Sequence, residues 1–206
     1  KLATDNSFKL GKNRLSLNIG YQRNQREEFG NPDDMNEREL YFDLKTVTYT
    51  AQFHFKEVQG WKTSIGVNGM KQQNSNRGAE QLIPDFNLFD IGGYAYAQKS
   101  YEKITISGGA RYDTRNIDAK NLLEGSEIKG SAVNKTFSNF SGSIGLAAAI
   151  SKLVNLKLNM ARGFRAPSIP ELASNGAHEG TIRYEYGDTD LKSETSLQFD
   201  AGAEFT

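Results

Sequence analysis

The stretch Arg-Leu-Ser-Leu-Asn-Ile-Gly-Tyr-Gln, residues 14–22, decides the fold class of this chain. Its large apolar side chains are Leu15, Leu17, Ile19 and Tyr21, and small or polar residues occupy the positions between them. Successive side chains of a β-strand point to opposite faces, so this alternation predicts a strand with one apolar and one polar face. An amphipathic helix would instead space its apolar residues three or four positions apart.

The same alternation recurs along nearly the whole chain. Counting the first stretch, it predicts about eight strands, at 14–22, 40–55, 61–67, 86–99, 103–113, 139–150, 155–160 and 197–205. In the second segment the apolar residues occupy even positions up to Leu44 and odd positions from Val47 onward. This change of apolar parity predicts a β-bulge near Lys45. The best helical candidate is a turn or two around 170–173.

The connections between these predicted strands alternate between short and long. Short ones lie around 56–59, 101–103 and 151–154, and long polar ones at 24–38, 71–85, 114–135 and 163–194. An up-and-down meander with tight turns at one end and long loops at the other is typical of an outer-membrane barrel, whose turns are periplasmic and whose loops are outside. In such a barrel the apolar face meets lipid and the polar face meets a wet lumen.

Composition excludes several other classes of protein. The 206 residues include 25 acidic and 25 basic ones and no cysteine, so we expect neither a nucleic-acid partner nor disulfides. The longest apolar run, 144–150, is far shorter than the roughly 20 residues of a transmembrane helix. Hydrophobic residues make up 37% of the chain and aromatic ones 11%, too many aromatics for a disordered segment.

Two alternatives stay open on periodicity alone. A stand-alone barrel of about eight strands would have a structural or adhesive role and an interior filled by side chains, and a soluble all-β binding module would bury its apolar face in a core. Aromatic residues near strand ends favour the membrane barrel, because they can form interfacial girdles. They are Tyr21, Phe55, Trp61, Tyr101, Tyr112 and Phe205.

Nothing in the chain has the pattern of an enzyme. It contains no nucleophile elbow, phosphate-binding loop, His-x-x-x-His pair or EF-hand spacing, and only two histidines. We therefore expect no catalytic residues and no resident cofactor.

One long loop and its borders carry a family resemblance. Residues 164–167 read Phe-Arg-Ala-Pro, and residues 188–191 read Asp-Thr-Asp-Leu before Lys-Ser-Glu. The chain resembles the TonB-dependent receptors of Gram-negative outer membranes, which have a Phe-Arg-Ala-Pro box followed by Asn-Pro-Asp-Leu and Lys-Pro-Glu. The second box departs from that pattern in its first two residues and in the replacement of the last proline by Ser193.

The resemblance implies an antiparallel, up-and-down transmembrane β-barrel. Members of the family are 22-stranded barrels with an N-terminal plug, and they import iron complexes, cobalamin, zinc or glycans with energy from the TonB complex. We accordingly expect residues 1–206 to form a partial barrel domain in the outer membrane, with the plug domain, through which TonB acts, outside this chain. An iron complex, siderophore or haem, is the expected cargo.

The resemblance also suggests site residues. His178 lies between the two boxes, where haem receptors of the family place a haem-ligating histidine, so it is the predicted metal ligand. The predicted ligand-binding set adds four neighbours, Glu179, Arg183, Tyr184 and Tyr186. The alternative is that His178 is a solvent-exposed loop residue without a ligand.

The two boxes themselves are expected to be structural. The predicted motif residues are Phe164, Arg165, Ala166, Pro167, Asp190 and Leu191. An arginine at this place can hold loop carbonyls or a carboxylate in a bidentate pair, while Pro167 fixes the chain's exit from the strand.

Overall fold

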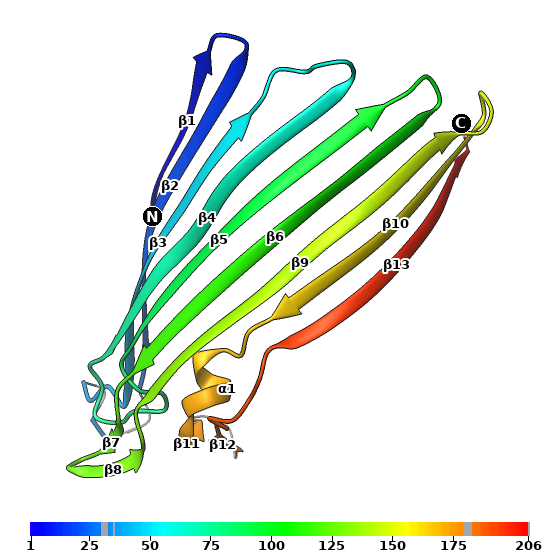
Figure 1. The fold of residues 1–206 in the computed structure, drawn as a ribbon. Coiled ribbons are helices and arrows are strands. Elements are labelled where there is room, and N and C mark those ends of the chain that lie inside the picture. The colour runs from blue at the N-terminus through cyan, green and yellow to red at the C-terminus, as the bar shows by residue number, and fades with distance from the viewer. Residues whose placement is uncertain (30–32, 35, 179–182, 206) are drawn as a thin grey trace.

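A single curved antiparallel sheet forms most of the protein (Figure 1). The computed structural model describes residues 1–29, 33–34, 36–178 and 183–205, except for the side chains of Ala177 and His178. Nine strands pair in the order β1-β2-β3-β4-β5-β6-β9-β10-β13. The predicted all-β antiparallel meander is therefore confirmed. Within the described residues the sheet is open, with β1 and β13 at its edges.

The elements follow one another without crossovers in the main sheet. Their bounds are β1 Leu2–Leu10, β2 Asn13–Glu28, β3 Leu40–His54, β4 Trp61–Asn76, β5 Phe86–Ser100, β6 Ile104–Ala119, β7 Leu122–Glu124, β8 Glu127–Gly130, β9 Val133–Ala149, β10 Val154–Arg165, α1 Ile169–Ala173, β11 Asn175–His178, β12 Arg183–Tyr186 and β13 Glu194–Phe205. The short helix lies where the sequence predicts one. Among the described residues, no helix is long and apolar enough to cross a membrane.

Three details of the strands differ from the sequence prediction. The count of eight was one short, because β1 pairs with β2 over its whole length although Thr4 and Asn6 interrupt its apolar parity. The strands are also longer than predicted, since β6 continues to Ala119 and β9 begins at Val133. Finally, the segments predicted to be loops contain two small hairpins, β7–β8 and β11–β12.

The β-bulge predicted near Lys45 is wrong. β3 pairs with β2 and with β4 in one unbroken register through this position. The parity of the apolar residues changes because the surroundings of the strand change, and its backbone stays regular. Val47 is exposed on one face, whereas Leu40, at the far end of the strand, is 2% exposed.

The main sheet has an apolar face and a polar face. Ile19, Ile91, Ile106 and Ile144 are on the apolar face, and they are 43–60% exposed. This face ends in a row of aromatic residues, Tyr21, Tyr49, Phe89, Tyr112 and Phe140, and the next positions outward on the same strands are mostly polar. Such a broad uncovered apolar face does not suit a protein surface in water.

The buried core lies on the other face, at the end that carries the long connections. Figure 1 shows α1 and the two small hairpins at this end, and the tight turns at the opposite end. Ile169 and Leu172 of α1 pack against Phe86, Leu88 and Ile117 of β5 and β6. Because these side chains belong to the polar face of the sheet, α1 covers that face locally and makes it apolar. We call this assembly the cap.

Candidate functional site

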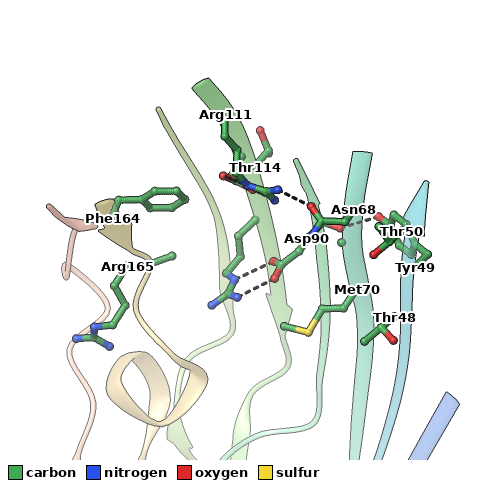
Figure 2. Close-up of a pocket in the computed structure, with 14 residues that line it drawn as sticks. Thr48, Tyr49, Thr50, Asn68, Met70, Asp90, Arg111, Thr114, Phe164 and Arg165 are labelled. Atoms are coloured by element: carbon green, nitrogen blue, oxygen red, sulfur yellow. Dashed lines mark hydrogen bonds and ion pairs between the residues drawn. The ribbon is translucent and has the colours of Figure 1, made fainter. Parts of the chain in front are cut away.

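A pocket on the polar face lies directly beside the cap. It has a volume of about 470 Å³, and Phe164 and Arg165 stand on one side of it while Asn68, Met70 and Asp90 stand on the other (Figure 2). The alternation of the strands explains this lining, since every second residue of β3 to β6 points to the polar face.

Two arginines of β6 hold the wall of the pocket together. Arg115 donates to both carboxylate oxygens of Asp90, at 2.8 and 2.7 Å. Arg111 makes a charge pair with Asp113 and donates to Oδ1 of Asn68 at 2.5 Å. These contacts tie β4, β5 and β6 together through side chains, in addition to the backbone ladder.

The charged side chains of the wall are therefore held in place, and their charges largely cancel. Each of the two arginines is paired with an aspartate, so the pocket offers hydrogen-bonding groups without a strong net field. In the described part of the chain, no group of three or more His, Cys, Asp or Glu residues is placed to hold a metal ion. The arrangement suits a polar passage or a weak binding surface better than a tight ionic site.

Arg165 joins the end of β10 to the cap. Its guanidinium makes a bidentate pair with Glu194 at the start of β13, at 3.1 and 2.9 Å, and donates to Glu171 of α1 at 2.7 Å. Glu171 also accepts the backbone N–H and the hydroxyl of Ser168, at 2.8 and 2.9 Å. The hydrogen bond from Arg165, together with those from Ser168, lowers the pKa of Glu171 to about 2.

The other residues of the first box lie at the same junction. Phe164 lines the pocket, Ala166 is buried in the cap, and Pro167 is buried just before α1. The Phe-Arg-Ala-Pro stretch thus connects the wall, the pocket and the cap within four residues.

The second box lies in the return from β12 to β13. The side chain of Asp188 accepts the backbone N–H of Asp190 at 2.8 Å, and the Asp188 carbonyl accepts the N–H of Leu191 at 3.4 Å. Asp190 lies 4.0 Å from the ammonium of Lys135 on β9. These contacts form a local turn whose side chains lie outside the pocket.

The predicted ligand-binding residues gather on the β11–β12 hairpin, apart from the pocket wall. Tyr184 and Tyr186 lie on one face of β12 with ring centroids 4.6 Å apart, and they are 47% and 77% exposed. Tyr184 donates to Oδ1 of Asn175 at 2.9 Å, and the amide of Asn175 donates to the carbonyl of Lys129 at 2.8 Å. Arg183 is exposed on the alternate face of β12.

His178 is placed only by its backbone, which pairs with Arg183 across the hairpin. Its side chain and the whole of Glu179 lie outside the described residues. The ligand set predicted from the sequence is thus described at three of its five members, and these three do not form a closed cage among themselves.

Sequence reasoning missed Asp90, Arg115 and Glu171. Parity places Asp90 and Arg115 on the polar face of neighbouring strands, but their pairing also requires the register between β5 and β6. Glu171 follows from the Ser-x-x-Glu spacing of 168–171, a signature of a helix N-terminus. Asn68, by contrast, gives no signal distinct from other polar wall residues.

The comparison with protein-family models decides the identity of this architecture. The model described as TonB dependent receptor-like, beta-barrel, matches residues 1–206. The chain belongs to the TonB-dependent receptor family. A search of curated proteins gave no significant match.

Solved structures agree with this assignment at the level of the fold. The Serratia marcescens hemophore receptor HasR, solved as a double mutant with its hemophore HasA and heme, matches with a TM-score of 0.71 and 16% identity over 98% of this chain. The FrpB iron transporter of Neisseria meningitidis matches with a TM-score of 0.69 and 16% identity over 99% of this chain. The copper transporter OprC matches with a TM-score of 0.67 and 15% identity over 94% of this chain.

The chain spans about a third of the length of these structures, namely 35%, 34% and 33% of HasR, FrpB and OprC. The open sheet is consistent with part of a larger barrel. In a TonB-dependent receptor barrel the apolar face is lipid-facing, the polar face is lumen-facing, and the long connections lie outside the cell. The pocket is therefore on the lumen side, just beneath the outer cap.

Proposed function

We propose that this chain is part of the wall and outer loops of an importer that moves a scarce nutrient across the outer membrane of a Gram-negative bacterium. The observation that carries the proposal is the polar pocket beneath an outward cap, on the lumen side of a TonB-dependent receptor barrel. Its mechanism is binding and gated passage without bond chemistry. The TonB complex would act through a plug domain that is not among residues 1–206.

An iron complex, siderophore or haem, is the proposed cargo. The exposed pair of Tyr184 and Tyr186 offers two neighbouring aromatic rings on one face of β12, and such rings suit a planar ligand. HasR was solved with heme and FrpB is named an iron transporter, which supports this class of cargo. OprC is named a copper transporter, so proteins of this fold are not restricted to iron.

His178 is the proposed metal ligand in this scheme, with Glu179 as a further oxygen donor. An imidazole is a common axial ligand of haem iron. Cargo captured by the hairpin would then pass to the pocket, whose paired charges bind weakly enough to release it. Differential affinity between states of the plug would drive that release.

The first test is a haem titration of the whole protein in detergent, followed by absorbance. We expect His178→Ala to weaken haem binding by about tenfold or more, since an axial ligand is lost. His54→Ala is the matched control, because His54 lies at the opposite end of the barrel wall, at the end of β3, and should leave the affinity unchanged. Equal affinities of His178→Ala and the unmodified protein would remove His178 from the ligand set.

Growth under iron limitation tests the import itself. A strain that lacks the protein should fail to grow when one iron complex, haem or a ferric siderophore, is the sole iron source. Reintroducing the gene for this protein into that strain should restore growth. Unimpaired growth on every iron complex would contradict the proposed cargo.

A further inference from the structure

A groove opens on the lipid-facing side at the tight-turn end, far from the cap. It has a volume of about 590 Å³ and lies between the turn that follows β1 and the turn that follows β3. Its lining residues are Lys12, Asn13, Phe55, Lys56, Val58, Trp61 and Thr63. In a receptor barrel this end faces the periplasm, so the groove lies at the level of the inner leaflet.

The floor of the groove is apolar and uncovered. Phe55, Val58 and Trp61 are 44%, 50% and 45% exposed. A tryptophan at this height lies at the boundary between acyl chains and headgroups, where its amphipathic ring is stable, whereas Phe55 and Val58 are purely apolar. An acyl chain beside these three side chains would remove them from contact with water.

The rim of the groove is cationic. Lys12 and Lys56 are both exposed, and neither takes part in an ion pair within the described ranges, where the neighbouring Glu57 pairs with Lys62 at 3.9 Å. The backbone N–H of Lys56 donates to Oδ1 of Asn13 at 2.8 Å, a bond that ties the two turns together and keeps both lysines at one place. The rim therefore presents two positive charges to a single ligand.

A third cation lies on the other side of Trp61. The ammonium of Lys99 is 5.3 Å from the Trp61 ring centroid and 5.1 Å from that of Tyr101. Lys99 belongs to the lipid-facing parity of β5, directly opposite Trp61 in the register. A lysine held between two interfacial rings places its charge at headgroup depth.

We propose that this groove binds one anionic phospholipid of the inner leaflet, with its phosphate at Lys12 and Lys56 and an acyl chain along Phe55, Val58 and Trp61. The inference depends on the membrane location in the proposed function but not on the cargo. Charge complementarity selects an anionic headgroup, because basic residues near a membrane surface are attracted to anionic lipid.

The test is native mass spectrometry of the whole protein in detergent, titrated with phosphatidylglycerol or with phosphatidylcholine. We expect the unmodified protein to retain phosphatidylglycerol more strongly. The variant Lys12→Gln/Lys56→Gln should bind it about tenfold more weakly. The matched control is Lys103→Gln/Lys152→Gln, which removes two exposed lysines from tight turns at the same end of the barrel but outside the groove, and it should keep the original affinity.

A second variant tests the apolar floor. Val58→Asn replaces an apolar side chain of the groove with a neutral polar one at an exposed turn position, and it should also weaken phosphatidylglycerol binding while leaving the lysines and the charge of the groove unchanged. A change of gel mobility on heating, measured for each variant, verifies that the barrel is folded.

Three results would overturn the proposal. They are equal losses in the two double variants, equal retention of the two lipids, and no retained lipid in a folded barrel. Failure of iron-complex uptake with lipid binding intact would instead refute the proposed cargo alone. A protein whose mobility does not change on heating would refute the membrane location and, with it, the lipid site.

Discussion

The two halves of β6 carry opposite patterns on a continuous backbone. Along 104–112 the even positions are apolar and face lipid, whereas along 115–119 the odd positions Ile117 and Ala119 are buried beneath the cap. Asp118, on the lipid-side parity of the outer half, is exposed. Which face of the strand carries the apolar residues thus depends on what covers that face. In the inner half this is lipid, and in the outer half it is α1.

The same reversal occurs in the neighbouring strands. In β3 it separates Val47 from Leu44, and in β5 it separates the exposed Phe89 from the buried Leu88. The row of aromatic residues that includes Tyr21, Tyr49 and Phe89 marks the level at which the parity changes. That level is where we place the outer boundary of the lipid.

The largest expected effect comes from the cap side of the outer half. Ile117 is 0% exposed, so Ile117→Ala should lower the free energy of unfolding by about 3 kcal/mol through lost contacts and a cavity. Asp118→Ala, at the next residue and on the exposed side, should change it by less than about 0.5 kcal/mol. Denaturant unfolding of the whole protein in detergent measures both, and similar costs would contradict the assignment of the two sides.

A smaller effect separates the two faces in the middle of β5. A Cβ added at Gly92 would meet Oδ1 of Asp113 and Nη2 of Arg111, at 2.0 and 2.2 Å, whereas one at Gly93 would meet nothing within 4 Å. Gly92→Ala should cost about 1–2 kcal/mol of unfolding free energy because the Arg111–Asp113 pair must move.

Gly93→Ala is the matched control for this comparison. It should be neutral or slightly stabilising, because alanine lowers the entropy of the unfolded chain. If both variants unfolded at the same denaturant concentration, the pair of charges would not lie over Gly92.

The smallest effect is a pH dependence confined to the cap. The pKa of Glu171 is about 2 in the folded protein against an ordinary value of 4.5. Its stabilising contribution is therefore fully present above pH 4.5 and is lost as the pH falls from 4.5 towards 2. Since Glu171 is partly exposed, we expect only about a threefold rise in hydrogen exchange of α1 over that range, corrected for the intrinsic rate.

Glu171→Gln supplies the control for the pH dependence. This variant should show raised exchange in α1 already at pH 6 and no further dependence between pH 4.5 and 2. A dependence that persisted in Glu171→Gln would assign the effect to another carboxylate.

Sequence alone predicts the lipid-facing positions well, because every strand of a membrane barrel must place apolar side chains against lipid. Leu15, Ile19 and Ile106 follow one rule, and no knowledge of tertiary contacts is needed to apply it. The outer half is harder to predict, since Leu44 and Ile117 belong to the packing of the cap, whose α1 residues are distant from them in sequence. The parity change at Leu44 was a true signal that was interpreted as a bulge.

The candidate site was predictable in the same uneven way. The Phe-Arg-Ala-Pro stretch identifies the junction of wall and cap, yet it does not indicate that Arg165 bridges Glu171 and Glu194. The pairing of Arg115 with Asp90 depends on the register between β5 and β6, which alternation within one strand does not determine. β1 was missed because Thr4 and Asn6 occupy lipid-facing positions near one edge of the described sheet.

The reversal of parity along β6 can be measured directly with single cysteines. Residues 1–206 contain no cysteine, so Ile106→Cys, Ser107→Cys, Ile117→Cys and Asp118→Cys each introduce one labelling site in this range. The spin labels are measured in the whole protein in lipid, with any cysteine outside this range replaced by serine. We predict that position 106 is accessible to oxygen and 107 to a water-soluble relaxation agent, whereas 117 is shielded from both and 118 is accessible from water. A label at 118 that is accessible to oxygen, together with one at 117 that is accessible to the water-soluble agent, would continue the pattern of 106 and 107 without a break and would contradict the account.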